Sequence, residues 1–206
     1  MFITMEGGEG SGKSTALKEI VETLGKEGYD VLLTREPGGT PISEEIRNII
    51  LDKKNTDMDP KTEALLYAAS RRQHIVQKIL PALKEGKIVI CDRFLDSSLA
   101  YQGGARHIGI DEVYAMNQFA TEGLLPDLTL LFDIEPEEGL KRIAANAGRE
   151  VNRLDVEQLP FHELVRSSFH EVAKRFPSRF VIIDASKSRK EVFAAAYAAI
   201  KERLAK

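Results

Sequence analysis

The sequence predicts an α/β fold in which helices flank a five-stranded parallel β-sheet. Five short apolar runs recur along the 206 residues, and each run is continuous rather than alternating between apolar and polar side chains. Continuous runs are typical of strands that are covered on both faces of a parallel sheet. Amphipathic helical patterns lie between the runs, and this alternation predicts one α/β domain over residues 1–206.

The elements follow one another along the chain in a regular order. The predicted strands are Phe2–Met5, Val31–Thr34, Ile88–Cys91, Leu128–Phe132 and Phe180–Ile183. The helical stripes repeat at three- and four-residue spacing. They are Ala16, Leu17, Ile20, Val21 and Leu24; Leu65, Leu66, Ala69, Ile75, Val76, Ile79, Leu80 and Leu83; Leu164, Val165, Phe169, Val172 and Phe176; and Val192, Phe193, Ala196, Tyr197, Ile200 and Leu204.

One segment departs from this pattern. Residues Ala144–Glu150 are small and polar, with few side chains suited to a core. Because they lie between two good helical patterns, we expect a flexible excursion over the body of the domain. An ordinary helix end followed by a loop fits the composition equally well.

Composition limits the class of protein. The hydrophobic content of 43% and the charged content of 30% are typical of soluble globular proteins, and a net charge of −3 argues against a general nucleic-acid binder. A single cysteine, Cys91, cannot form an internal disulfide and suits a reducing compartment. No apolar stretch approaches the ~20 residues that a membrane-spanning helix requires. We therefore expect a cytoplasmic protein that binds neither nucleic acid nor a membrane.

A glycine-rich loop of the form G-x-x-x-x-G-K-[ST] follows the first strand and precedes an amphipathic helix. Its backbone N–H groups can converge on phosphate oxygens, and the helix adds the positive end of its dipole. Lys13 is then a point charge for the β- and γ-phosphates, and the Ser14 hydroxyl is a ligand for Mg²⁺. A chance glycine turn would not account for the strand and the helix around it. The ATP-binding residues predicted here are Gly7, Gly8, Glu9, Gly10, Ser11, Gly12, Lys13, Ser14 and Thr15.

Such a loop does not name a reaction, so residues at other strand ends must decide it. Asp92 and Arg93 follow the third strand, where a carboxylate can hold Mg²⁺ through water and a guanidinium can bind a second phosphate. Glu36 precedes a Pro-Gly-Gly turn that keeps it at the same edge of the sheet. The alternatives are a surface ion pair for Asp92 and Arg93, and a simple strand-to-helix turn capped by Thr40 for the second motif.

Two side chains in the long helical pattern indicate a base-sized site. Tyr67 and Arg71 lie four residues apart and therefore share one face of the helix. A ring and a guanidinium on one face could stack on a planar base and hydrogen-bond it. The alternative that the local sequence leaves open is an exposed basic turn over Ser70–His74.

Together these motifs resemble those of thymidylate kinases, over essentially the whole chain. The motifs that carry the resemblance are Glu6–Ser14, Thr34–Thr40, Tyr67–Arg72, Asp92–Gly103 and Asn152–Asp155. The resemblance implies the P-loop nucleoside-monophosphate-kinase fold, a homodimer, and transfer of the ATP γ-phosphoryl group to thymidine monophosphate (dTMP) with Mg²⁺. Phe94 and Tyr67 depart slightly from the family pattern, and neither departure changes the implied reaction.

The resemblance also implies an acceptor site made of Glu36, Arg47, Tyr67, Arg71, Arg93, Ser98, Tyr101 and Gln102. In this site Tyr67 stacks on thymine and Tyr101 packs near the sugar. The hydrogen bonds to the base come from Arg71, Ser98 and Gln102. Arg47 and Arg93 hold the acceptor phosphate, and Glu36 lies on the same side.

On the donor side, the resemblance assigns Ser14 and Asp92 to Mg²⁺, partly through water, and places adenine near Ser186 and Lys187. In related kinases an arginine of the loop can stabilise the transferring phosphoryl group, but here the loop carries the carboxylate of Glu9. The resemblance also implies a small mobile lid, which corresponds to the excursion at about residues 142–153. We therefore expect the missing positive charge to come from this lid. The catalytic residues predicted in this way are Lys13, Asp92, Arg93, Arg149 and Arg153.

Three other functions compete with this interpretation. A P-loop deoxynucleoside kinase is the main alternative, although two arginines for an acceptor phosphate make little sense with a neutral nucleoside. A GTPase would want an Asn-Lys-x-Asp motif, which the chain lacks. A partitioning ATPase hydrolyses ATP without an acceptor, so it would have no use for the cluster of Tyr67, Arg71 and Gln102. The four histidines show no metal-ligand spacing, so neither they nor Cys91 are assigned a catalytic role.

Overall fold

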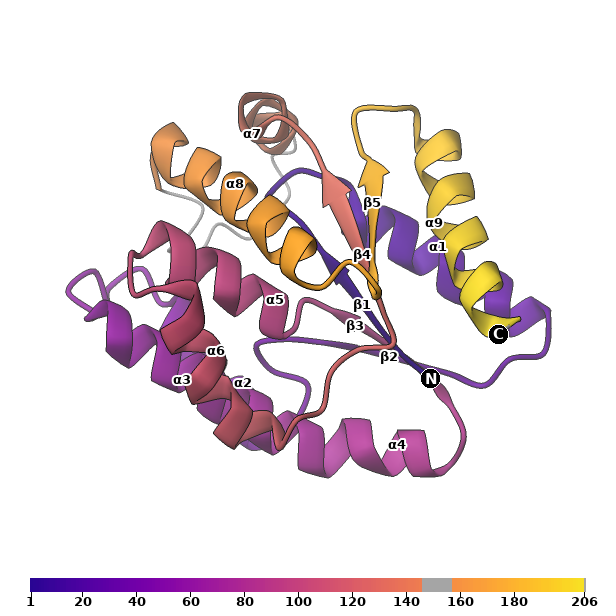
Figure 1. Ribbon diagram of the computed structural model, residues 1–206, viewed down its shortest axis with the longest axis horizontal. Helices are drawn as coiled ribbons and strands as arrows, with labels where there is room; N and C mark the ends of the chain where they lie inside the picture. The colour runs from indigo at the N-terminus through magenta and orange to yellow at the C-terminus, as the bar shows by residue number, and fades with distance from the viewer. Residues whose placement is uncertain (146–156, 206) are drawn as a thin grey trace.

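The computed structural model describes residues 1–145 and 157–205, and one sheet of five parallel strands lies at its centre (Figure 1). The strands are β1 (Phe2–Glu6), β2 (Val31–Arg35), β3 (Ile88–Asp92), β4 (Leu128–Asp133) and β5 (Phe180–Asp184). They lie in the order β2-β3-β1-β4-β5, which places the strand before the glycine-rich loop in the middle. The predicted α/β class and all five predicted strands are confirmed.

Each strand is one residue longer than the apolar run that predicted it. The additional residues are Glu6, Arg35, Asp92, Asp133 and Asp184, and all of them are charged. Because the strands are parallel, these charged residues all lie at the same edge of the sheet. The carboxyl edge of the sheet is therefore rich in charge, whereas its centre is apolar.

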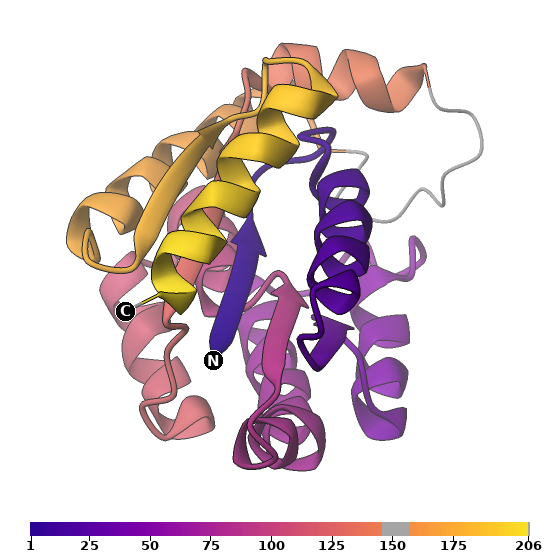
Figure 2. The same ribbon diagram turned by 90° about the vertical axis from the view of Figure 1, so that its right-hand side faces the viewer.

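Helices cover both faces of the sheet. On one face lie α1 (Lys13–Lys26) and α9 (Arg189–Leu204), which run side by side (Figure 2). The other face is covered by α4 (Leu80–Lys84), α5 (Leu95–Ser98), the π-helical segment η2 (Leu99–Ala105), α6 (Ile110–Thr121) and α8 (Leu159–Arg175). Next to α6 pack α3 (Pro60–His74) and, against α3, α2 (Pro41–Leu51), while α7 (Pro136–Ala144) lies at the carboxyl edge of the sheet (Figure 1).

The expectation that all five strands are covered on both faces is wrong for the two edge strands. Leu33 in β2 is 39% exposed and Ile182 in β5 is 50% exposed. The three inner strands are buried almost throughout. Continuous apolar runs therefore marked every strand, but burial on both faces holds only where helices reach across the sheet.

The long stripe predicted from Leu65 to Leu83 does not form one buried face. Helix α3 passes into a π-helical turn, η1 (Ile75–Ile79), before α4 begins. A π turn has more residues than an α turn, so the side chains that follow it are rotated about the axis. Val76 within this turn is 38% exposed, whereas Ile75 and Ile79 are fully buried. Leu65 is 57% exposed for a different reason, since the buried face of α3 runs through Ala64, Ala68 and Arg71.

A buried ion pair fixes the short helix α5 against the rest of the domain. Both oxygens of Asp96 accept hydrogen bonds from the Arg179 guanidinium, at 2.6 and 2.7 Å. The Thr129 hydroxyl in β4 joins the same cluster. Since Asp96 follows closely on Arg93, this pair also fixes the chain that leads out of the carboxyl edge of β3.

None of the helices within residues 1–145 and 157–205 combines the length and the hydropathy needed to cross a membrane.

Candidate active site

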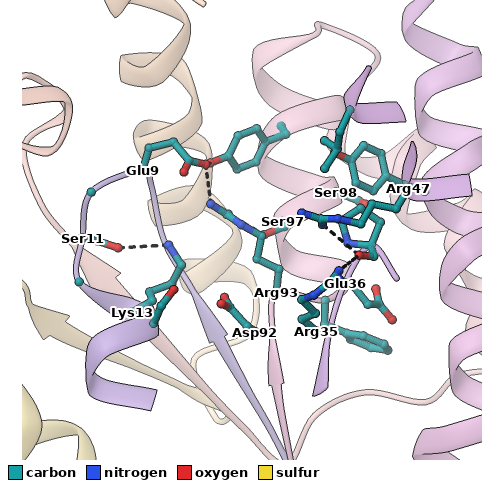
Figure 3. Close-up of a pocket in the computed structure, with 18 of the residues that line it drawn as sticks. Glu9, Ser11, Lys13, Arg35, Glu36, Arg47, Asp92, Arg93, Ser97 and Ser98 are labelled. Carbon is teal, nitrogen blue, oxygen red and sulfur yellow. Dashed lines mark hydrogen bonds and ion pairs between the residues drawn. The ribbon is translucent and has the colours of Figure 1, made fainter. Parts of the chain in front are cut away.

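A cavity of about 510 Å³ opens at the carboxyl edge of β1, β2 and β3 (Figure 3). It is lined by the glycine-rich loop and by side chains from α2, α3, α5 and η2. Of the predicted site residues in the described part of the chain, those that line it are Glu9, Gly10, Ser11, Gly12, Lys13, Ser14, Thr15, Glu36, Arg47, Tyr67, Arg71, Asp92, Arg93, Ser98, Tyr101 and Gln102. The fold thus brings together positions that are far apart in the sequence.

The remaining predicted positions are not part of this lining. Gly7 and Gly8 begin the loop, and their carbonyl groups accept hydrogen bonds from Lys13. Ser186 and Lys187, the predicted adenine position, are exposed after β5 and do not line the cavity. The lid arginines, Arg149 and Arg153, lie outside the described residues.

Lys13 is the buried cation of the glycine-rich loop. Its Nζ atom donates to the carbonyl oxygens of Gly7 and Gly8, at 2.8 and 2.9 Å, and to Ser11 Oγ at 3.1 Å. The helix α1 begins at Lys13, after Gly12 in the left-handed region at φ 81°. Burial lowers the pKa of Lys13 to about 8 because it disfavours the charged form. An anionic phosphate beside this ammonium group would favour the charged form again.

Two glycines allow the loop to pack directly on α7. A Cβ atom on Gly10 would overlap the Gly139 carbonyl oxygen, and a Cβ on Gly139 would overlap that of Glu9. Gly10 has φ 69°, which favours glycine. Any larger side chain at Gly139 would therefore push α7 and the phosphate-binding loop apart.

Arg93 connects the loop to the opposite wall of the cavity (Figure 3). Its guanidinium donates to the Gly7 carbonyl at 3.0 Å and to Ser97 Oγ at 3.2 Å, and it pairs with Glu9 Oε1 at 2.6 Å. The Tyr101 hydroxyl donates to the same Glu9 oxygen at 3.0 Å. The carboxylate in the loop is thus directed at Arg93, and it neutralises an arginine rather than facing a phosphate.

The backbone of Arg93 is held in an uncommon conformation. Its φ is 68°, in the left-handed region that non-glycine residues seldom adopt. Its N–H donates to the Met5 carbonyl at 3.0 Å, and the next N–H, that of Phe94, donates to Glu6 Oε1 at 2.8 Å. Such strain is often found where a functional side chain must be aimed in one direction.

Glu6 is a fully buried carboxylate that the sequence reasoning left without a role. Besides Phe94 N–H, it accepts a hydrogen bond from Ser97 Oγ at 2.5 Å, and that hydroxyl also accepts from Arg93. Burial, followed by the negative charge of Asp96, raises the pKa of Glu6 to about 7. The signal that could have revealed Glu6 is a charged residue at the end of an apolar strand, immediately before the loop.

The Pro-Gly-Gly turn holds Glu36 at the edge of the sheet, as predicted. The Glu36 N–H donates to the Asp92 carbonyl at 3.0 Å, so the turn continues the pairing of β2 with β3. Both glycines of the turn have positive φ, 117° and 90°. Arg47 of α2 donates to the Pro37 carbonyl at 3.1 Å, which directs its guanidinium toward the cavity (Figure 3).

The Glu36 carboxylate is buried between two side chains of α3. Oε2 accepts from Arg71 Nε at 2.8 Å, and Oε1 lies 3.0 Å from His74 Nδ1. The other ring nitrogen of His74 lies 2.7 Å from Thr34 Oγ1. His74 was assigned no role from the sequence, and the structure shows that it fixes the orientation of Glu36.

Arg71 is 1% exposed, so the alternative of an exposed basic turn is wrong at this position. One terminal nitrogen donates to Asn117 Oδ1 at 2.5 Å, and the other donates to the Phe94 carbonyl at 3.0 Å and to Ser98 Oγ at 3.1 Å. Asn117 lies in α6 and was not anticipated from the sequence. Arg71 therefore links α3, α5 and α6 at the base-sized end of the cavity.

Asp92 and Ser14 fit a magnesium ion that is held mainly by phosphates and water. Asp92 Oδ1 is buried and has no hydrogen-bond partner in the described part of the chain, whereas the side chain of Ser14 is exposed at the cavity. No group of three or more His, Cys, Asp or Glu side chains that could hold a metal ion occurs within residues 1–145 and 157–205. Mg²⁺ needs no such cluster, since one or two carboxylates and substrate phosphates suffice.

Comparisons with known proteins agree with this geometry. The thymidylate kinase family matches residues 5–196 of the chain. A thymidylate kinase from Bacillus licheniformis is 62% identical over 188 residues, 91% of this chain and 89% of its own. One from Bacillus velezensis is 60% identical over 206 residues, 100% of this chain and 97% of its own. The crystal structure of thymidylate kinase from Ehrlichia chaffeensis superposes with a TM-score of 0.78 at 33% identity, and covers 98% of both chains.

Replacing Glu6 by glutamine should change the stability of the protein in a pH-dependent way. The pKa of Glu6 rises from 4.5 to about 7 on folding, so the folded protein binds this proton more tightly than the unfolded chain. The free energy of unfolding of the native protein, relative to Glu6→Gln, should therefore fall as pH rises through this window and level off above it. The fall should reach up to about 3 kcal/mol. Urea unfolding of both proteins across the window measures it, and a pH-independent difference would contradict the assignment.

Replacing Gly139 by alanine should displace the phosphate-binding loop, because the new Cβ would overlap the Glu9 carbonyl oxygen. A misplacement of about 1 Å can cost ~10²-fold in rate, so we expect kcat/KM for ATP to fall by on the order of 10- to 100-fold. Gly25→Ala in α1 is the matched control, since nothing lies within 4 Å of its Cβ. The control should keep its kinetics and gain up to ~1 kcal/mol of stability. Native kinetics in Gly139→Ala would show that α7 does not constrain the loop.

Proposed function

The chain belongs to the thymidylate kinase family, and we propose that this cavity is the place where it phosphorylates dTMP with ATP. The observation that supports the proposal is that one cavity contains both a phosphate-binding loop and a site of the size of a base. The phosphate-binding loop with Lys13 lies at one end, and the buried Arg71 with its base-sized surroundings lies at the other. Arg93 lies between them, where the two phosphates would meet. The family match does not favour the deoxynucleoside kinase alternative.

The donor half of the site holds the phosphates of ATP. The backbone N–H groups of the loop and the positive end of the α1 dipole face the phosphate oxygens, and Lys13 adds a full charge. Ser14 and Asp92 hold Mg²⁺, in part through water. The ion supplies neutralisation of the charge on the transferring group.

The acceptor half holds the phosphate of dTMP with arginines. Arg47 and Arg93 present planar donor groups that match phosphate oxygens. The acceptor phosphate is already an anionic nucleophile, so the reaction needs no strong general base. Glu9 acts on this side as well, because its ion pair with Arg93 holds the guanidinium in place.

The base of dTMP fits the far end of the cavity. Tyr67 stacks on the thymine ring, and Arg71, Ser98 and Gln102 supply hydrogen bonds to its edge. Tyr101 packs near the sugar, where a ring disfavours a 2′-hydroxyl. Arg71 is already held by Glu36, so its donors have a fixed direction before the base binds.

We further propose that residues 1–206 act as one kinase domain whose lid is segment 142–153. Helix α7, which packs on the phosphate-binding loop, leads into this segment, and Arg142 at its start lines the cavity. Arg149, supported by Arg153, then closes over the transferring phosphoryl group. This lid charge replaces the one that Glu9 cannot provide.

The homodimer and the cytoplasmic location are proposals with separate support. Large apolar side chains are exposed on three neighbouring helices, α2, α3 and α6: Ile42 is 50%, Ile49 49%, Leu65 57% and Phe119 91% exposed. Apolar side chains exposed on neighbouring helices can form an interaction surface, and most soluble oligomers are homo-oligomers. The buried free thiol of Cys91 and the absence of an internal disulfide suit a reducing cytoplasm.

A coupled assay of ADP release with a panel of acceptors tests the reaction. We expect dTMP to give the highest kcat/KM among dTMP, dUMP, UMP, dCMP, AMP and thymidine. Thymidine lacks the phosphate that Arg47 and Arg93 bind, so its kcat/KM should be lower by at least ~10³-fold. Preference for any other monophosphate would refute the assignment of the base site. Turnover of thymidine without turnover of dTMP would instead favour the deoxynucleoside kinase.

Removing either lid arginine should slow the chemical step. We expect Arg149→Ala to lower kcat by ~10³-fold or more, as for other arginines that stabilise a transferring phosphoryl group, and Arg153→Ala to lower it less. Lys141→Ala, which removes an exposed cation of α7, is the control and should keep kcat. If both arginine variants turn over at the native rate, the lid does not supply the missing charge.

A further inference from the structure

Gln102 is held from behind by a carboxylate that no part of the proposed mechanism uses. Gln102 lines the cavity, and its side chain is almost fully buried. Its amide nitrogen donates to Glu63 Oε1 at 2.8 Å. Glu63 lies in α3 and is itself 1% exposed. Burying a carboxylate costs free energy unless it is paired or hydrogen-bonded, so its position behind an amide that contacts the base suggests a role for it.

The contact determines which way the amide of Gln102 points. An ionised carboxylate only accepts hydrogen bonds, so the nitrogen of the amide must face Glu63 and the oxygen cannot. The Arg106 guanidinium, whose Nε lies 3.5 Å from the same Glu63 oxygen, stabilises the negative charge. Within the described part of the chain the Gln102 amide oxygen accepts no hydrogen bond. The oxygen and the second N–H do not make this contact, and since Gln102 lines the cavity we take them to be the groups that a base would meet.

The direction of the amide decides which pyrimidine it can read. Thymine presents a donor at N3 and an acceptor at O4, which match the oxygen and the N–H of an amide in this orientation. Cytosine presents an acceptor at N3 and a donor at N4, so it matches only an amide that is turned over. Turning the amide of Gln102 would direct its oxygen at the Glu63 carboxylate, which repels it.

We propose that Glu63 is a specificity-determining positioning residue, which fixes the amide of Gln102 so that the site accepts thymine and rejects cytosine. The inference rests on the proposed base site, in which Gln102 hydrogen-bonds the acceptor. Glu63 acts through Gln102 and does not touch the substrate. Arg71 also disfavours the amino group of cytosine, but its position depends on Glu36 rather than on Glu63.

The test compares dTMP with dCMP as acceptors in the ADP-release assay. Glu63→Met keeps the length of the side chain and removes the acceptor, so the amide of Gln102 is free to turn. We expect the ratio of kcat/KM for dTMP to that for dCMP to fall by on the order of 10- to 100-fold. Glu63→Gln keeps a carbonyl oxygen that can still accept from Gln102, so it should restore most of the ratio. An unchanged ratio in Glu63→Met overturns the proposal.

A control separates specificity from stability. Asp59 caps the N-terminus of α3 through its side chain and lies away from the base, so Asp59→Ala should lower the unfolding temperature and leave the ratio unchanged. In a Gln102→Ala background, adding Glu63→Met should have no further effect on the ratio, because the amide that it orients is gone. A further fall in that background would show that Glu63 acts by another route.

Two outcomes distinguish this inference from the proposed function. If the native protein does not prefer dTMP over dCMP, the proposed base site is wrong. If it prefers dTMP and Glu63→Met preserves that preference, only the role of Glu63 is wrong. Should Glu63→Met fail to fold, NMR of the native protein decides the matter. The side-chain amide proton of Gln102 that is donated to Glu63 should be protected from exchange with solvent. Equal, fast exchange of both amide protons would contradict a hydrogen bond that holds the amide in one orientation.

Discussion

Arg71 and Glu36 lie 2.8 Å apart with both side chains buried, and the acceptor end of the cavity is organised around this ion pair. Taking two charges out of water is costly, and the attraction between them compensates only if the remaining donors and acceptors are also satisfied. Here His74 contacts the second oxygen of Glu36, and Asn117, the Phe94 carbonyl and Ser98 accept from the terminal nitrogens of Arg71. One guanidinium therefore sets the spacing of the β2–α2 turn, α3, α5 and α6. Removing either partner would leave a buried charge alone, at a cost of about 3–5 kcal/mol.

The same principle explains why so many carboxylates lie around a site for anions. In the proposed mechanism Lys13 and Arg93 both bind phosphates. Burial disfavours the charged form of Lys13, and the positive charge of Arg93 disfavours it further. Glu9 and Glu6 offset this repulsion, and they do so from positions in which each accepts hydrogen bonds from protein groups. From the sequence alone, the carboxylate of Glu9 looks misplaced, because it would repel phosphates bound by the loop. In the structure its side chain turns away to Arg93, so its charge helps to place a phosphate ligand.

The sequence predicted the strands and the phosphate-binding loop well because both depend on local patterns. Every predicted strand was correct to within one residue. Burial of the edge strands and of the long helical stripe was wrong, because these depend on which helix covers which strand and on the π turn η1. The supporting residues of the site were missed for a related reason. Glu6 and Ser97 are 91 residues apart, and Arg71 and Asn117 are 46 apart, so no spacing in the sequence relates them. The resemblance to a family assigned substrate contacts, but it gave no role to Glu6, His74 or Asn117, which hold other residues of the site in place.

The residues that orient the donors of the site bear on how this enzyme catalyses its reaction. Phosphoryl transfer depends mainly on alignment and on neutralisation of charge, so a donor group contributes only as far as its direction is fixed. Arg71 has Glu36 behind it, Arg93 has Glu9 beside it, and Gln102 has Glu63. In each case a carboxylate fixes the direction of a donor that the proposed mechanism assigns to a substrate. An arginine or a glutamine at the right position in the sequence is therefore not sufficient for the chemistry. On the proposals above, the carboxylate that orients the donor contributes to specificity and to rate through the direction that it imposes.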